Sequence, residues 1–170
     1  MTSAAETSQP SAKAATLSDI EASYRADFHR FLRVAEAVTG ELDTARDSVQ
    51  EAFANAIRYR NTFRADGDLR SWLWSCVVNA ARRERSAQLR STLPVADLGA
   101  DESQPLTGND RIAQAIAELP DRQRLVLFLR YYADLDYRTI GDILGIETGT
   151  VSATLHAGHR TLRRTLKEVP

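Results

Sequence analysis

Residues 91–110 divide this chain into two parts and limit each part to a small domain. The segment has prolines and glycines at four positions, Pro94, Gly99, Pro105 and Gly108. It contains no lysine or arginine, and its acidic residues are Asp97, Asp101, Glu102 and Asp110. Prolines and glycines at this density interrupt regular structure, so the composition predicts an extended acidic linker. Two small domains, residues 18–90 and 111–170, are expected on either side of it.

Both parts place apolar residues at the spacing of an amphipathic helix. Residues 28–35, 42–56 and 69–80 each follow the i, i+3, i+4, i+7 pattern that lines one face of a helix. The second part continues with the same spacing from Ile112 onward. No run shows a convincing alternation of apolar and polar residues, which is the pattern of a half-buried strand. An all-α fold is therefore predicted.

Several classes of protein are excluded by the motifs that the sequence lacks. Residues 1–17 are rich in alanine, serine and threonine but have no apolar run, so a disordered tail is predicted rather than a secretory signal. No stretch approaches the roughly 18 apolar residues of a membrane span. Cys76 is a single cysteine, and no phosphate loop, nucleophile elbow or paired metal motif is present. We therefore expect a cytoplasmic protein that is not an enzyme, with no cofactor, no metal and no membrane insertion.

Residues 135–162 have the pattern of a helix-turn-helix. Gly141 supplies a small residue where two helices would cross, and Gly145 supplies the turn. Either Thr148 or Thr150 can cap the second helix. A helical wheel turns one face of that helix outward, where a DNA-binding helix contacts the major groove. This outward face holds Ser152, Ala153, His156, Ala157, Arg160 and Arg163. An ordinary helical hairpin with a solvated polar face is the alternative.

Three segments of the second part resemble region 4 of bacterial sigma factors. They are residues 119–127 (LPDRQRLVL), residues 137–146 (YRTIGDILGI) and the run Gly149-Thr150-Val151. Alone, these segments also fit the helix-turn-helix of LuxR-type regulators. A regulator that binds operator DNA without being a polymerase subunit is therefore the alternative function.

The first part resembles sigma region 2, and this favours the sigma factor. Residues 47–53 (DSVQEAF) are similar to the region 2 segment that the family uses to bind polymerase. Phe63, then Trp72-Leu73, then Asn79 and three arginines resemble the pattern that follows it. With both motif sets in this order, the chain resembles the small extracytoplasmic-function (group 4) sigma factors of the sigma-70 family. Such proteins direct RNA polymerase to promoters and assist promoter melting.

The resemblance implies partners and site residues. Core RNA polymerase is expected to contact Asp47, Gln50, Glu51 and Asn55. Minus-10 promoter DNA is expected to contact Phe63, Trp72, Asn79, Arg82, Arg83 and Arg85. Minus-35 DNA is expected to contact Thr150 and the outward face of the second helix, with Arg122, Arg124 and Arg138 on phosphates. An anti-sigma protein is a further partner that the family allows.

Some expectations stay open on the sequence alone. Phe63 and Trp72 have the spacing of core residues as well as of binding residues. Trp74 lies about 200° around the helix from Trp72, so one of the two tryptophans is expected at an edge. The second helix lacks several basic residues that are common in the family, which leaves the strength of minus-35 recognition open and predicts a flatter salt dependence of binding. The acidic linker is expected either to enter the polymerase cleft or to act as a solvated spacer.

Overall fold

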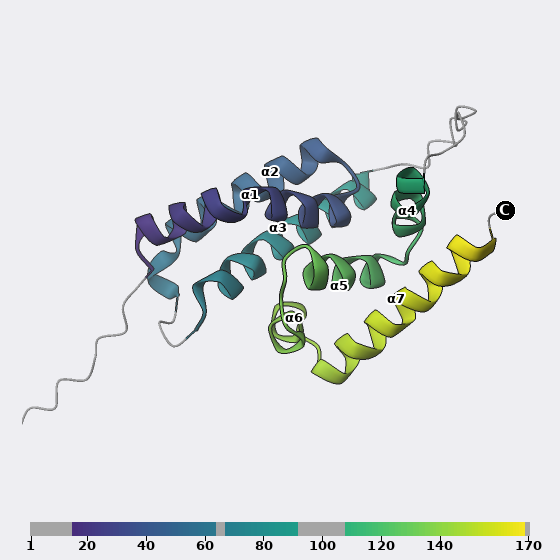
Figure 1. Ribbon diagram of the computed structural model, residues 1–170. Helices are drawn as coiled ribbons and strands as arrows, with labels where there is room; N and C mark the ends of the chain where they lie inside the picture. Colours follow the sequence, from purple (N-terminus) through teal and green to yellow (C-terminus); the bar gives the residue numbers. More distant parts are fainter. Residues whose placement is uncertain (1–14, 64–66, 92–107, 169–170) are drawn as a thin grey trace, which may run out of the picture.

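The computed structural model describes residues 15–63, 67–91 and 108–168, and these residues form helices (Figure 1). The elements are α1 (Leu17–Thr39), α2 (Leu42–Arg58), a short 3-10 turn (Arg60–Thr62), α3 (Leu69–Ser91), α4 (Gly108–Ala117), α5 (Asp121–Tyr131), α6 (Tyr137–Leu144) and α7 (Thr148–Glu168). The described part contains no strand, so the all-α prediction is confirmed. Within the same residues, no helix has the length and apolar character needed to cross a membrane.

Helices α1, α2 and α3 form a three-helix bundle around an aromatic core (Figure 1). Phe31 lies at its centre, with its ring centroid 5.2 Å from that of Phe53 and 4.3 Å from that of Trp74. Val49 and Val77 are fully buried around these rings. The helical spacing of apolar residues in the sequence therefore corresponds to faces that meet inside the bundle.

The start of α1 corrects part of the predicted tail. The Thr16 hydroxyl accepts a hydrogen bond from the Asp19 amide at 3.1 Å, and the Asp19 carboxylate accepts one from the Thr16 amide at 3.3 Å. This capping box satisfies amides that the first turn of a helix leaves unpaired. Disorder over residues 1–17 is thus wrong for residues 15–17, and the rest of the tail lies outside the described residues.

The linker prediction falls mostly outside the described residues. Helix α3 ends at Ser91 and α4 begins at Gly108, so the predicted linker overlaps the first residues of α4. Asp97, Asp101 and Glu102 belong to the part of the chain that is not described.

Helices α6 and α7 form the predicted helix-turn-helix. The Asp136 carboxylate caps α6 by accepting a hydrogen bond from the Thr139 amide at 2.7 Å, and this bond lowers the pKa of Asp136. Gly145 ends α6 in the left-handed conformation with φ of 65°, as predicted. Neither predicted cap of α7 is correct, because the helix begins at Thr148 and the amide of Thr150 donates to the Glu147 carbonyl.

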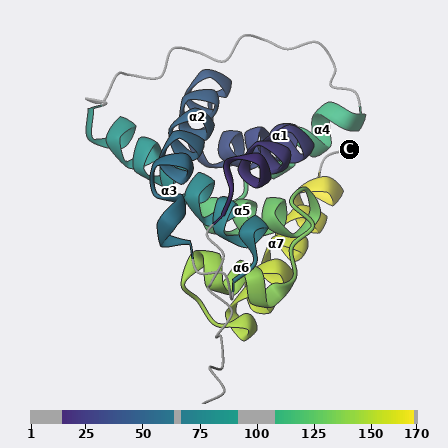
Figure 2. The ribbon, with the colours of Figure 1, turned by 90° about the vertical axis from the view of Figure 1, so that its left-hand side faces the viewer.

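The two parts of the chain pack against each other, which the sequence did not predict. Helix α5 lies against α1, and α6 lies against α3 (Figure 2). The Arg70 guanidinium crosses this contact, donating to the Ala133 carbonyl at 2.7 Å and pairing with Asp27 at 3.3 Å. Buried residues of both parts belong to one hydrophobic cluster. In this structure the expected two domains therefore form a single packed body.

Candidate nucleic-acid interface

Helix α7 has the inner and outer faces that the helical wheel predicted. Val151 and Leu155 are buried, and Leu162 packs against the core. On the outer face Ala153, His156, Arg160 and Arg163 are exposed, while Ser152 and Ala157 are half-buried. The first turns of this outer face line a shallow hollow of about 470 Å³, together with Thr150 and the neighbouring Arg122 of α5. Residues of the second helix and Arg122, both predicted to contact minus-35 DNA, therefore line the same hollow.

Two further features of this face decide between sequence interpretations. Arg138 is exposed in the first turn of α6, as a phosphate-contacting residue requires. His159, which shares helical spacing with His156, bonds to the Tyr131 hydroxyl at 3.1 Å instead of joining a metal site. The described residues contain no group of three potential metal ligands.

Arg124 does not belong to the exposed surface, and this corrects its predicted role. Its side chain is only 14% exposed, and its guanidinium donates to the carbonyls of Ala37, Ala117 and Leu119 at 2.7–3.1 Å. It also pairs with Asp121 at 2.6 Å. Asp121 is the first residue of α5, and Pro120 occupies the N-cap position. Arg124 therefore ties α5 to the end of α1, and its guanidinium faces these carbonyls and Asp121.

Replacing Arg124 with methionine is expected to lower the free energy of unfolding by about 2 kcal/mol. Methionine keeps most of the apolar stem but leaves the carbonyls of Ala37, Ala117 and Leu119 without this donor. A fully buried unsatisfied group costs about 1–3 kcal/mol, and the total stays near the lower end because two of these bonds are only part-buried and the third is exposed to water. Urea denaturation followed by circular dichroism measures the change. The exposed Arg122→Met is the matched control, with an expected change within about 0.5 kcal/mol. Equal losses for the two variants would contradict the assignment of Arg124.

The predicted polymerase-binding residues lie on the surface of α2. Asp47, Gln50 and Glu51 are exposed, and Asn55 is half-buried. The Glu51 carboxylate accepts a hydrogen bond from the Asn55 amide at 3.4 Å and pairs with Arg83 of α3 at 2.9 Å. Two residues predicted for different partners, Glu51 and Arg83, are thus in direct contact.

The two tryptophans of α3 have different environments. Trp74 is fully buried, whereas Trp72 is half-buried and packs on Phe63 with ring centroids 5.5 Å apart. This confirms that one of the two tryptophans lies at an edge. Phe63 and Trp72 both pack against the hydrophobic core, as core residues do, but each side chain is also partly exposed to solvent.

The other predicted minus-10 residues gather further along α3. Asn79, Arg82 and Arg83 are exposed and line one open hollow of about 650 Å³ that also includes Glu51. Arg85 is different, because it is half-buried and lines a groove between α3 and α5. Cys76 is partly buried on the same helix, and burial raises the pKa of its thiol. The structure thus groups three of the predicted arginine and asparagine side chains and sets Arg85 apart.

Comparisons with known proteins agree with both halves of the structure. Residues 24–91 match the model of sigma-70 region 2, and residues 109–162 match that of sigma-70 region 4. The chain is 34% identical to the ECF RNA polymerase sigma factor SigL of Mycobacterium tuberculosis, covering 81% of this chain and 82% of that protein. The chain belongs to the extracytoplasmic-function sigma factors. Its role is to direct bacterial RNA polymerase to promoters, and the alternative of a free-standing helix-turn-helix regulator is not supported.

Other sigma factors are similar over comparable lengths. The ECF sigma factor SigW of Bacillus subtilis is 30% identical, with 76% of this chain and 79% of that protein covered. The sigma factor YlaC of the same species is 27% identical, with 86% and 91% covered. Two solved structures share the fold: RpoE of Bartonella quintana with the anti-sigma factor NepR (TM-score 0.70, 18% identity, 91% and 100% covered), and CnrH with the cytosolic domain of CnrY (TM-score 0.69, 17% identity, 91% and 92% covered).

The sigma regions can now be placed on the fold. Region 2 comprises most of α1 together with α2 and α3, and region 4 comprises α4 to α7 up to Leu162. Helix α7 continues beyond the matched segment to Glu168. The residue that sequence reasoning misplaced, Arg124, lies in a helix whose run of apolar residues, 125–129, indicates burial on several sides. That run shows that α5 is buried on several sides, but it does not indicate which way Arg124 faces.

Proposed function

We propose that region 2 of this sigma factor binds core polymerase through α2 and captures melted minus-10 DNA through α3. The observation that carries the proposal is a single stripe along α3, in which Asn79 and Arg83 are exposed and Trp72 is half-buried. At 100° per residue, Trp72, Asn79 and Arg83 lie within about 40° of one another around the helix. An aromatic ring, an amide and a guanidinium in one row offer stacking, base-edge hydrogen bonding and phosphate contact, which single-stranded DNA requires.

Region 4 would contact minus-35 DNA through the outer face of α7, with Arg122 and Arg138 on phosphates. The side chains nearest the start of α7 are small or neutral, so few bases would be distinguished by charged side chains. The chain would act in the cytoplasm as a binding subunit, without catalysis of its own.

Promoter binding would require the packed arrangement of regions 2 and 4 to open. Elements centred 10 and 35 base pairs upstream of the start site are about 85 Å apart along B-form DNA, at about 3.4 Å per base pair. Regions 2 and 4 touch each other in this structure, so one packed body cannot cover both elements at once. Opening would break the Arg70 bond to Ala133 and the Arg124 bond to Ala37.

An anti-sigma protein would bind the packed form. Two proteins with this fold were solved in complex with such partners, NepR and the cytosolic domain of CnrY. A groove of about 400 Å³ runs between regions 2 and 4 of this chain. Its lining includes apolar Val38, Leu125 and Ile146, three arginines and one acidic residue: Arg82, Arg85, Arg122 and Asp121. An amphipathic segment with acidic residues would match this apolar and basic lining.

Alanine substitutions in the two proposed surfaces of region 2 are expected to have different effects, one on promoter-specific transcription and the other on the binding of core polymerase. Trp72→Ala with Asn79→Ala should leave binding to core polymerase intact and lower promoter-specific transcription by about tenfold or more, because stacking is worth about 1–3 kcal/mol per base. Asp47→Ala with Gln50→Ala should instead weaken the binding of core polymerase. Reconstituted transcription on a promoter library and co-elution with core enzyme measure the two effects.

The control for these variants is Arg46→Gln, which removes an exposed charge next to Asp47. Arg46 pairs with Asp43 of the same helix at 3.1 Å. It should change neither readout. The proposal fails if wild-type protein binds core polymerase but no promoter-dependent transcript appears. It also fails if the Trp72 and Asn79 variant transcribes normally.

A further inference from the structure

The groove between regions 2 and 4 is lined by three arginines that have no acidic partner in the part of the chain that the structure describes. Arg82 and Arg85 come from α3 of region 2, and Arg122 comes from α5 of region 4. Within the described residues, none of the three guanidinium groups forms an ion pair or a hydrogen bond. The carboxylate on the lining, that of Asp121, is already paired with Arg124 at 2.6 Å. The groove therefore carries an excess of positive charge to which both regions contribute.

Arg85 is the arginine of this groove that is partly withdrawn from water. It is half-buried, and its Nε atom is buried without a hydrogen-bond partner among the described residues. Its guanidinium reaches the end of α1, where a Cβ at Gly40 would lie 4.0 Å from Nη1. The C-terminal end of a helix supplies only a partial negative charge. A partly buried cation is costly unless a full opposite charge pairs with it, so the position of Arg85 indicates a site for an external anion.

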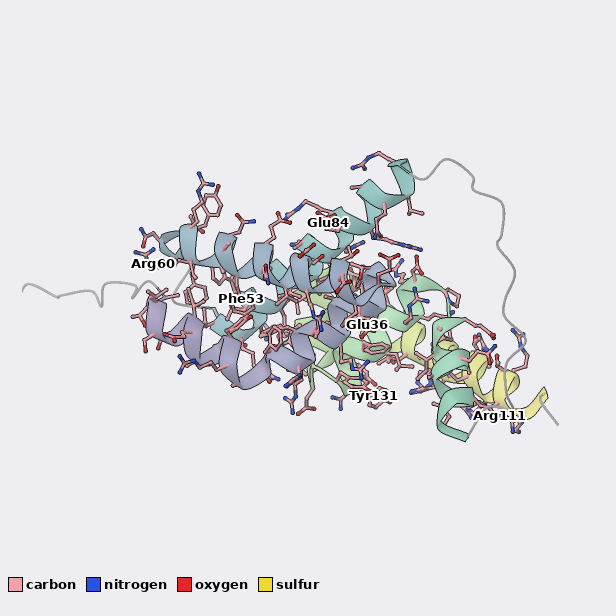
Figure 3. All side chains as sticks on the ribbon, turned by 90° about the horizontal axis from the view of Figure 1, so that it is seen from above. Glu36, Phe53, Arg60, Glu84, Arg111 and Tyr131 are labelled. Atoms are coloured by element: carbon pink, nitrogen blue, oxygen red, sulfur yellow. The ribbon has the colours of Figure 1, made fainter. Side chains whose placement is uncertain are left out.

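Two glutamates of region 2 that are close to the groove in sequence have other surroundings. Glu84 precedes Arg85 but lines the neighbouring hollow, together with Asn79. Glu36, near the end of α1, pairs with Arg33 of the same helix at 3.1 Å. In the view from above, both glutamates are labelled on region 2, which lies nearest the viewer with α5 beneath it (Figure 3). Neither carboxylate lines the groove, so neither supplies the missing negative charge.

The apolar part of the lining indicates what the anion is attached to. The apolar side chains are all aliphatic and come from both regions: Val38, Leu89, Leu125, Leu144 and Ile146. Leu89 is 63% exposed, so its apolar surface is in water when the groove is empty. Among the described residues that line the groove there is no aromatic ring, so a nucleobase would have no stacking partner. An aliphatic chain needs only apolar contact, and about 400 Å³ is within the size range of small-molecule sites.

We infer that this groove binds a single-chain amphiphile with a phosphate head, of the class of alkyl or acyl phosphates. The head lies at Arg82, Arg85 and Arg122, because guanidinium groups match phosphate oxygens in charge and geometry. The chain lies on the aliphatic lining.

This ligand contacts regions 2 and 4 together, so it binds only the packed form and stabilises it. It therefore opposes the opening that promoter binding requires, and this consequence for transcription rests on the proposed function. An acidic segment of an anti-sigma protein would use the same lining, so the two ligands exclude each other.

The test is the binding of decyl phosphate to the full chain, measured by isothermal titration calorimetry below the concentration at which the probe forms micelles. From butyl to decyl phosphate, the affinity should rise by about threefold for each methylene group that the groove buries. Arg85→Gln with Arg122→Gln should weaken the binding of decyl phosphate by about tenfold or more, because charge-assisted hydrogen bonds to the head are lost. Circular dichroism checks that the helices are retained.

A second variant tests the chain site without touching the arginines. Leu89→Asn changes an exposed position, so the fold should be retained. It should weaken the binding of decyl phosphate by about threefold or more and leave the binding of butyl phosphate nearly unchanged. An equal effect on both probes would overturn the placement of the chain.

The matched control, Arg25→Gln with Arg33→Gln, removes the same charge from exposed positions of α1 and should leave the affinity for decyl phosphate unchanged. Equal losses for the two arginine pairs would overturn the inference, as would a wild-type chain that does not bind decyl phosphate. Equal affinities for inorganic phosphate and decyl phosphate would show an adventitious ion only. Tighter binding of ADP than of decyl phosphate would make the groove a nucleotide site instead. Calorimetry uses neither polymerase nor promoter, so reconstituted transcription tests the proposed function separately.

Discussion

Replacing Trp74 with alanine is expected to lower the free energy of unfolding by about 3–5 kcal/mol, a large part of the stability of a small domain. Trp74 is fully buried and its ring centroid lies 4.3 Å from that of Phe31, which also contacts Phe53. Alanine would leave a cavity at the point where α1, α2 and α3 meet. Urea denaturation measures the loss, and binding to core polymerase should fall with the population of folded region 2.

Two further variants separate cavity formation from other effects. Trp72→Ala, two residues away and half-buried, should cost much less stability while impairing transcription. The Trp74 indole N–H has no hydrogen-bond partner among the described residues. Trp74→Phe therefore removes no hydrogen bond, and it should be less destabilising than Trp74→Ala. A larger loss for Trp72→Ala than for Trp74→Ala would show that the assignment of core and edge is wrong.

The helices and their buried faces could be predicted from sequence because local spacing determines them. Val151 and Leu155 are buried because a helix of 3.6 residues per turn places them on one side, whatever lies opposite. Gly145 is similar, since the left-handed conformation at the end of α6 is a local requirement that glycine meets most easily. The outer face of α7 follows from the same geometry, so the exposure of most candidate minus-35 residues on that helix could be predicted.

Contacts between distant residues could not be predicted in this way. Arg122 and Arg124 are two residues apart in the same turn of α5, and the sequence assigned both to phosphate. The carbonyl of Ala37, contributed by region 2, holds Arg124 inward together with the carbonyls of Ala117 and Leu119. The packing of α5 on α1 and of α6 on α3 likewise depends on surfaces that have no shared sequence pattern.

The candidate sites show the same division. Trp72, Asn79 and Arg83 share a stripe because they belong to one helix, and their grouping follows from spacing. The ion pair between Glu51 and Arg83 joins two helices, and it links the proposed polymerase surface to the proposed minus-10 surface. The sequence did not predict this ion pair. Glu51 belongs to one motif and Arg83 to another, and neither motif shows that the two side chains meet.

Introducing a side chain at Gly141 is expected to disrupt the helix-turn-helix. A Cβ atom built at this position would lie 2.6 Å from the Ile146 carbonyl oxygen, which is closer than folded proteins tolerate. The neighbouring atom belongs to the backbone of the turn, so it cannot move aside as a flexible side chain would. Gly141→Val adds two methyl groups to this Cβ, and overpacking of this kind costs about 1–3 kcal/mol or more. Thermal denaturation of the full chain measures the loss.

Gly149 provides the control for the same substitution in the same motif. A Cβ at Gly149 would meet no atom within 4 Å, because this residue lies exposed in the first turn of α7. Gly149→Val should therefore leave the stability nearly unchanged, even though valine would project toward DNA. Gly141→Val should reduce the affinity for duplex DNA by opening the turn while leaving the binding of region 2 to core polymerase intact. Comparable stability for the two variants would contradict this prediction. It would mean that the turn can move away from α6, so that the short distance between a Cβ at Gly141 and the Ile146 carbonyl oxygen does not constrain the helix-turn-helix.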